Sequence, residues 1–213
     1  MKRIGVIALI LLFGLSAYAR APFTEFKVGQ FNPKKVKAGY LFGVNLGRMI
    51  DESISWSFEF NYFQKNYRET TSFVGEGTHN LDDPVIVQLE QEFTTRMLPL
   101  FFKLNYEHPL GAGSPFYARA SAGLGWELLW NREVNYLENK KSTRFYHGFG
   151  WTGSGGVGFA ISSSANLFCD LFYNSSKVKR NKKKNEIGLP SWEELDVSGL
   201  GFRIGISIVG FGW

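Results

Sequence analysis

Alternation between large apolar residues and small or polar ones is the feature that most constrains this chain. From Ile54 to Tyr62 every second residue is large and apolar, and the residues between are serine, glutamate and asparagine. Successive side chains of a β-strand point to opposite faces, so this pattern predicts a strand with one apolar face. The same alternation recurs in segments 40–46, 98–106, 116–130, 149–161, 167–173 and 200–208.

The number and spacing of these segments predict a closed barrel. Bacterial single-chain barrels use an even number of strands, so seven segments call for an eighth, and the best candidate is 24–31, ahead of the turn-forming Asn32-Pro33. Short connections at 51–52, 108–115 and 162–165 alternate with long polar ones at about 68–92, 131–143 and 175–196. This asymmetry is typical of outer-membrane barrels, whose turns face the periplasm and whose loops face outside.

The direction of the apolar face separates a membrane barrel from a soluble, lipocalin-like barrel that binds a ligand inside. The seven apolar rows contain no Asp, Glu, Lys or Arg, and the intervening face is rich in glycine and serine. An eight-stranded barrel is only wide enough for side chains to fill. Bulky residues such as Trp56, Trp126, Trp151 and Phe202 therefore belong outside, against lipid. We predict an all-β, eight-stranded antiparallel up-and-down transmembrane β-barrel, with the soluble barrel as the alternative.

The N-terminus has the features of an export signal. Lys2 and Arg3 precede an apolar run over 4–15 and a small-x-small sequence at 17–19. This run is shorter than the ~20 residues that a transmembrane helix needs. We therefore predict a cleaved signal peptide over 1–19, a barrel domain over 20–213 and a location in the bacterial outer membrane.

Charge and cysteine content exclude several other classes of protein. The whole chain has a net charge of +5, and removing Lys2 and Arg3 leaves it only mildly basic, which argues against a nucleic-acid-binding surface. The single cysteine, Cys169, excludes an intramolecular disulfide framework. No histidine has a companion at metal-ligand spacing, so we predict no metal and no cofactor.

A small set of charged residues falls on the face that is predicted to point inward. Three are negative and three positive, namely Glu59, Lys103, Arg119, Glu127, Asp170 and Arg203. An unpaired charge inside a barrel would be costly, whereas balanced signs allow ion pairs. These residues are expected to form a polar core that fills the lumen and fixes the strand register. A gated or selective pore lined by the same residues is the alternative.

Three segments carry a resemblance to a known family. They are 39–47 (GYLFGVNLG), 98–106 (LPLFFKLNY) and 115–125 (PFYARASAGLG). They resemble the small outer-membrane β-barrel domain family, similar to the OmpA, OmpX and OmpW barrels. The resemblance implies an eight-stranded barrel over nearly the whole mature chain. It also implies handling by the barrel-assembly machinery, for which Trp213 would supply the C-terminal aromatic residue.

The long connection at 175–196 contains a dense run of cations. They are Lys177, Lys179, Arg180, Lys182, Lys183 and Lys184. A cationic loop on the outer side would be attracted to the phosphates of lipopolysaccharide. We predict contact with lipopolysaccharide there, and a solvated charge run is the alternative.

An enzymatic function finds little support in the sequence. Some small barrels modify lipid A, and His147 and Ser175 share the outward face near the outer ends of their strands. Their distances from the intervening turn differ, so they are not expected to lie opposite each other. We predict a protein with no catalytic residues.

Four large apolar residues share the inward face with the charges. They are Leu41, Phe101, Phe168 and Phe172. They either line an apolar pocket, as the resemblance to OmpW would allow, or fill the interior as wedges. We predict a monomeric outer-membrane barrel with a plugged polar interior that serves envelope integrity or surface and lipopolysaccharide interaction. A carrier or narrow channel for small hydrophobic molecules is the alternative.

Overall fold

The computed structural model describes residues 21–73, 86–136, 139–181 and 192–211, which form β-strands joined by turns. Within these ranges no helix is long and apolar enough to cross a membrane. The strands are β1 (Pro22–Pro33), β2 (Gly39–Met49), β3 (Ile54–Phe73), β4 (Ile86–Pro109), β5 (Phe116–Asn135), β6 (Lys140–Ala160), β7 (Ala165–Asn181), β8 (Trp192–Asp196) and β9 (Gly199–Val209).

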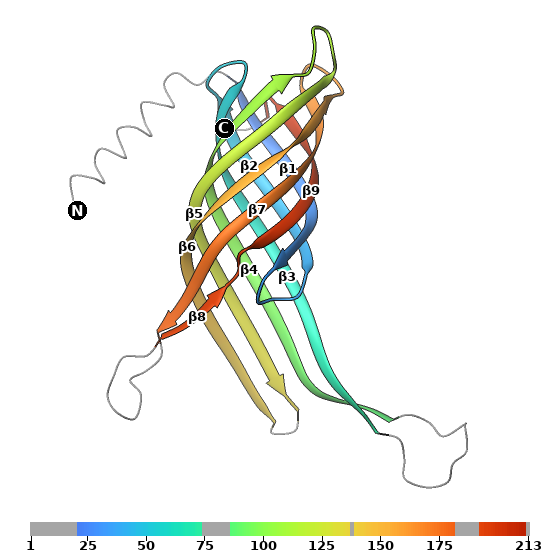
Figure 1. Ribbon diagram of the computed structural model, residues 1–213, viewed down its shortest axis with the longest axis vertical. Helices are drawn as coiled ribbons and strands as arrows, with labels where there is room; N and C mark the ends of the chain where they lie inside the picture. The colour runs from blue at the N-terminus through green and yellow to red at the C-terminus, as the bar shows by residue number, and fades with distance from the viewer. Residues whose placement is uncertain (1–20, 74–85, 137–138, 182–191, 212–213) are drawn as a thin grey trace, which may run out of the picture.

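The strands close into an antiparallel barrel with eight positions around its wall (Figure 1). β1 to β7 pair in chain order, β7 pairs with both β8 and β9, and β9 pairs with β1. β8 and β9 occupy one position in the wall because only Val197 and Ser198 separate them along β7. The predicted fold class is confirmed, and so is the weakest predicted strand, 24–31, which lies within β1 and completes the closure.

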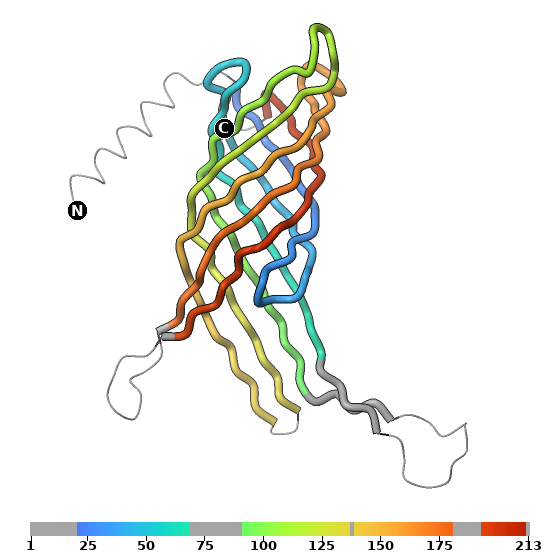
Figure 2. The backbone as a smooth tube through the Cα atoms, in the orientation of Figure 1, coloured from blue at the N-terminus to red at the C-terminus, as the bar shows by residue number. Residues whose placement is uncertain are grey.

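Short turns and the described ends of the chain lie at the same end of the barrel, which we call the short-turn end (Figure 2). Between β2 and β3, the Asp51 carboxylate accepts hydrogen bonds from the amides of Ser53 (2.7 Å) and Ile54 (2.6 Å). Such side-chain bonds stabilise a tight reversal without a longer loop. At the same end of the barrel, β9 ends at Val209, and the next residue, Gly210, has a φ of +81°, a conformation that favours glycine.

The opposite, long-loop end differs from the sequence prediction, because much of the predicted loop is strand. The connection predicted at 131–143 is a hairpin in which pairing continues to Asn135 and Lys140. Likewise β3 continues to 73 and β4 begins at 86, whereas the predicted loop ran from 68 to 92. The outward positions of these extensions include exposed charged residues such as Arg68 and Arg132, so the extensions lack the apolar alternation on which the prediction relied.

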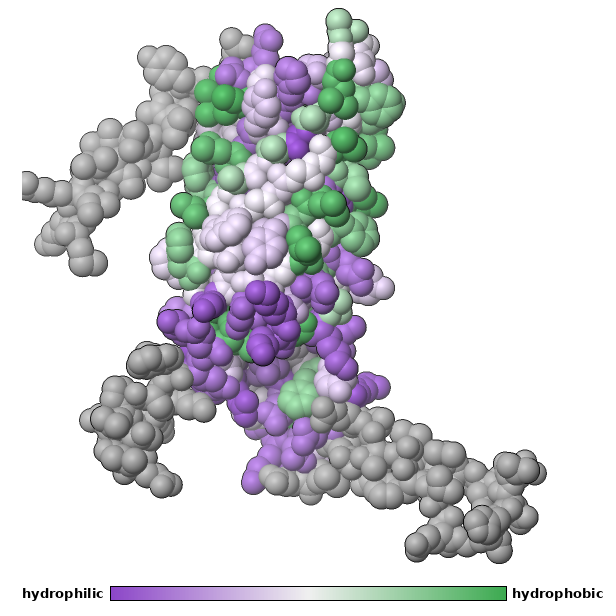
Figure 3. All heavy atoms as spheres, in the orientation of Figure 1, coloured by the Kyte–Doolittle hydropathy of each residue, from purple (hydrophilic) through white to green (hydrophobic). Residues whose placement is uncertain are grey.

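The outer wall of the barrel is apolar, as the alternation predicted. Trp126 is 54% exposed and Trp151 49%, and both point away from the lumen. Figure 3 shows pale and green residues over most of the barrel and purple, hydrophilic residues towards the long-loop end. Trp56 differs from the prediction, since only 6% of it is exposed. It lies on the outward face but is covered, with its ring stacked 6.1 Å from that of Phe102.

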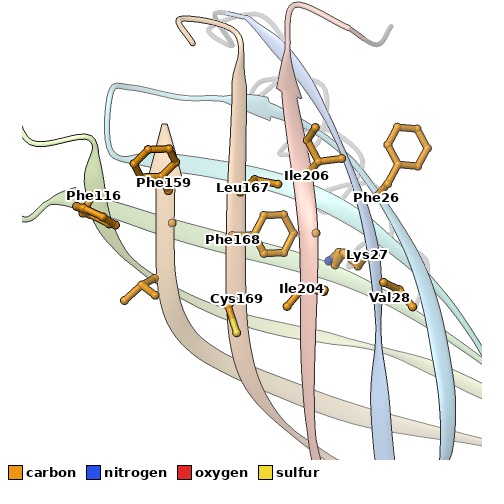
Figure 4. Close-up of a pocket in the computed structure, with 13 residues that line it drawn as sticks. Phe26, Lys27, Val28, Phe116, Phe159, Leu167, Phe168, Cys169, Ile204 and Ile206 are labelled. Carbon is orange, nitrogen blue, oxygen red and sulfur yellow. The ribbon is translucent and has the colours of Figure 1, made fainter. Parts of the chain in front are cut away.

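An apolar groove of about 640 Å³ crosses the outer wall near the short-turn end (Figure 4). Phe116 and Phe159 border one side of it and Phe26 the other. Between them, Leu167 and Ile204 project from β7 and β9. The side chains that face outward here are apolar, and they therefore suit contact with the acyl chains of lipids.

Candidate functional site: the filled barrel interior

Glu59 on β3 is the centre of a buried ion-pair network in the barrel. Its Oε2 atom lies 3.1 Å from the Lys103 ammonium and also forms an ion pair with Lys27. The Arg203 guanidinium donates to both Glu59 oxygens at 3.2 Å, and the Asn61 amide donates to Oε1 at 2.7 Å. Three cations therefore surround one carboxylate, and strands β1, β3, β4 and β9 are joined across the lumen.

Two further carboxylates extend this network. Glu25 on β1 accepts from Arg119 at 2.7 Å and from Asn45 at 2.8 Å, and it lies 3.6 Å from Lys27. Asp170 on β7 lies 3.3 Å from the Arg119 Nε atom and 3.5 Å from the Arg203 Nε atom. Each carboxylate thus has at least two cationic partners, which offsets the cost of removing these charges from water.

The structure brings together five of the six charged residues that the sequence assigned to the interior. Glu59, Lys103, Arg119, Asp170 and Arg203 all belong to the ion-pair network. The sixth residue, Glu127, lies outside it.

Glu127 on β5 is fully buried but has no ion pair among the described residues. Its Oε1 atom accepts a hydrogen bond from the Asn174 amide on β7. Glu127 is therefore held by a neutral hydrogen-bonding side chain rather than by a cation.

Sequence reasoning missed two members of the network, Glu25 and Lys27. Both point inward from β1, where they pair in register with Asn45 and Gly43 of β2. The sequence did contain a signal for them, because both residues occupy odd positions of segment 24–31, which point inward. That segment was the least regular of the predicted strands because its outward positions include the polar residues Thr24 and Gln30.

An apolar layer fills the lumen on the long-loop side of the ion-pair network. It consists of Phe31, Leu41, Phe63, Met97, Leu129, Tyr146, Phe172, Val178 and Val197. The Phe31 ring lies 5.8 Å from that of Phe63 and 5.5 Å from that of Phe172. Leu41 and Phe172, two of the four inward apolar residues, are therefore packed within this layer.

The other two inward apolar residues pack nearer the charges. Phe101 and Phe168 are both buried, and the Arg119 guanidinium lies 3.8 Å above the centre of the Phe168 ring. On the opposite side of the network, the Arg203 guanidinium lies 5.1 Å from the Phe172 ring. Cation–π contacts of this kind join the apolar and charged parts of the filling.

The cationic run lies on a strand where the sequence predicted a loop. Lys177, Lys179 and Arg180 belong to β7 and pair in register with Asp196, Glu194 and Glu193 of β8; Lys182, Lys183 and Lys184 lie outside the described residues. Strand pairing is favoured here because acidic residues stand opposite the cations. Lys179 lies 3.1 Å from Glu194 and Lys177 lies 3.6 Å from it. A hydrogen bond from Lys179 lowers the pKa of Glu194 below its usual value.

The two residues weighed for catalysis are not brought together. His147 pairs in register with Lys179, whereas Ser175 pairs with Trp151, four residues further along β6. The His147 ring stacks on Phe145 with 5.9 Å between ring centres. In the described ranges there is also no group of three His, Cys, Asp or Glu side chains that could hold a metal ion.

Comparisons with known proteins agree with this architecture. No protein-family model matches the chain, and no curated protein matches it. Among solved structures, it is similar to the outer membrane protein OprG from Pseudomonas aeruginosa, with 14% identity over 92% of this chain and 98% of that chain and a TM-score of 0.56. It is also similar to a major outer membrane protein from Thermus thermophilus, with 12% identity over 89% and 100% of the two chains and a TM-score of 0.52. The chain therefore has the fold of small outer-membrane β-barrels.

Proposed function

We propose that this chain is an outer-membrane barrel with a closed lumen, and that it serves envelope integrity and interactions at the cell surface. The apolar outer wall supports a membrane location because apolar side chains suit contact with lipid. The closed barrel also satisfies its backbone hydrogen bonds within the wall, without water. In this proposal residues 1–19 are the export signal, the barrel-assembly machinery inserts the chain, and the mature protein is a monomer. The long-loop end then faces outside.

The filled interior is the observation that carries this proposal. The ion-pair network around Glu59 and the apolar layer around Phe63 succeed each other along the lumen, and both consist of buried side chains. The inward apolar residues act as packing, which argues against the carrier of small hydrophobic molecules. Non-enzymatic action fits the same interior, because its carboxylates are held by ion pairs or amide hydrogen bonds.

Electrical recording from a planar bilayer tests the closed lumen. Purified full-length protein, whose folding is checked by heat modifiability on a detergent gel, is expected to give no stable conductance steps. A large porin inserted in the same bilayers is the positive control. Stable, large steps from the folded protein would contradict the closed lumen and favour the pore.

Tryptophan quenching by brominated lipids tests which side chains face the membrane. In variants that keep one tryptophan and replace the others by phenylalanine, bromine is expected to quench Trp126 and Trp151 strongly, because both are exposed on the outer wall. Trp56 is expected to be quenched much less, because Phe58 and Phe102 pack against it. Undiminished emission from Trp126 and Trp151 would overturn the membrane location.

Lipopolysaccharide binding is supported by outward cations beside an aromatic girdle. Lys177 and Lys179 face outward from β7, and Arg96 and Arg132 are exposed on the outward faces of β4 and β5. Arg96 pairs in register with Trp130, an aromatic residue of the kind that marks the membrane interface. Phosphates at that level would form charge-assisted hydrogen bonds with these side chains.

Three double variants test this contact, and each removes the same charge. Adding lipopolysaccharide to vesicles is expected to raise the Tm of the unmodified protein. In Arg96→Gln/Arg132→Gln this rise is expected to fall by about half or more, since each cation near an anionic surface contributes about 1 kcal/mol. Lys177→Gln/Lys179→Gln should have a smaller effect because Glu194 already neutralises part of this charge.

The control is Lys140→Gln/Lys141→Gln, at the far tip of the β5–β6 hairpin (Figure 1). This variant should keep the full rise in Tm. Equal loss in all three variants would indicate a general effect of net charge, and no loss in any of them would remove the lipopolysaccharide contact.

A further inference from the structure

A cavity of about 270 Å³ lies inside the barrel at the long-loop end. We call it the mouth cavity, and its lining residues are Lys35, Val36, Lys37, Lys65, Tyr67, Phe93, Thr95, Leu129, Asn131 and Leu195. It is bordered by the β1–β2 hairpin, which ends well before the long extensions of β3 to β6 (Figure 1). A cavity of this size suits a small molecule.

The charge of the mouth cavity has a single sign. Three of its lining residues are lysines and none is acidic. Within the described ranges, Lys35 and Lys65 have no ion pair, and Lys37 places its ammonium 3.4 Å above the centre of the Tyr67 ring. The cations are therefore available to a negatively charged ligand.

Two described acidic residues at this end of the barrel are engaged with other cations. Asp196 lies 3.7 Å from Lys34, and Glu133 lies 3.0 Å from Arg144. Neither carboxylate lines the mouth cavity. Within the described residues, the three lysines are thus not neutralised by an acidic side chain.

The walls and floor of the mouth cavity are largely apolar. The rings of Tyr67 and Phe93 stack with 6.2 Å between their centres. Leu129 closes the floor as a member of the apolar layer, and Val36 and Leu195 pack against that layer. The cavity therefore combines a cationic rim with an apolar base, the two features that a molecule with an anionic head and a short apolar body would need.

We propose that the mouth cavity binds small anionic amphiphiles, specifically short-chain carboxylates. The carboxylate accepts charge-assisted hydrogen bonds from Lys35, Lys37 and Lys65, and the hydrocarbon body lies against Leu129 and the aromatic pair. This site is separate from the outward cations that face lipopolysaccharide, and it leaves the lumen closed beneath it.

Calorimetric titration of the full-length protein in nanodiscs of neutral lipid, with hexanoate as the probe and empty nanodiscs as the blank, tests this site. Hexanoate is expected to bind with saturation. The variant Lys35→Gln/Lys37→Gln/Lys65→Gln should bind it at least about tenfold more weakly, because each lysine contributes a charged hydrogen bond. The control Lys140→Gln/Lys141→Gln/Lys179→Gln removes equal charge away from the mouth cavity and should change the affinity by less than about twofold.

Two further probes separate the parts of the proposal. Hexanol tests the cationic rim, and inorganic phosphate tests the apolar base; both should bind much more weakly than hexanoate. Heat modifiability confirms that each variant is folded. Absence of hexanoate binding, equal binding of hexanol or phosphate, or equal weakening in the control variant would overturn the proposal.

Discussion

Replacing Glu59 by glutamine is expected to lower the free energy of unfolding by about 3 kcal/mol or more, because removing one member of a buried ion pair leaves its partners uncompensated. Lys27, Lys103 and Arg203 all face this carboxylate from different strands. The neutral amide fits the same space but leaves three cations close together in the lumen. Urea titration of the protein in lipid vesicles, followed by tryptophan fluorescence, measures the change.

Two variants separate loss of the charge network from general damage. Glu92→Gln removes a carboxylate from an ion pair near the surface, 3.5 Å from Arg68, and should cost less than about 1 kcal/mol. Glu59→Gln combined with Lys103→Gln removes one charge of each sign and should recover part of the lost stability. Similar losses for Glu59→Gln and Glu92→Gln would show that the interior network contributes little to stability.

The variant Gly156→Ala is expected to destabilise the barrel by about 2 kcal/mol, because the wall leaves no room for a methyl group there. A Cβ atom at this position would lie 2.0 Å from the carbonyl oxygen of Cys169 and 2.7 Å from the Cα atom of Asp170. Backbone of β7 would have to move, and Asp170 would move with it away from Arg119 and Arg203. The same urea titration measures this loss.

The neighbouring residue provides a matched control. Gly155 faces outward, and the nearest atom to its added Cβ would be the carbonyl oxygen of Arg119, at 4.0 Å. Gly155→Ala should therefore be neutral or stabilise the protein by about 0.5 kcal/mol, because alanine restricts the unfolded chain more than glycine does. If the two variants have equal stability, packing inside the wall is looser than these distances indicate.

The sequence by itself predicted the barrel and the faces of its strands because both follow from local periodicity. The alternation assigned both Trp126 and Trp151 to the outward face of their segments, and both are exposed on the outer wall. Each apolar row extends over several residues, so one irregular position does not alter its assignment. The first strand was harder to recognise because Thr24 and Gln30 are polar on its outward positions and Phe31 is apolar on an inward one.

Contacts between inward residues were only partly predictable, because they depend on how far each strand is shifted along its neighbours. Glu59 and Arg203 are 144 residues apart in sequence and meet only after β9 pairs with β1 and closes the barrel. Lys27 reaches Glu59 across β2, and Glu127 lies beside Asn174 across β6, outside the ion-pair network. The alternation shows which side chains point into the lumen. It does not show how far along the barrel each one lies or which residue it contacts.

The two ends of the barrel illustrate the same division. Tight turns at the short-turn end were predictable from local residues such as Asp51, whereas the strand extensions at the other end lack an apolar face and become visible only through cross-strand pairing. Local alternation therefore determined the wall of this protein. Only the closed tertiary structure decided which charges neutralise each other and where, in the part of the chain that the structure describes, three lysines have no acidic partner. Both depend on distances between strands that are far apart in sequence.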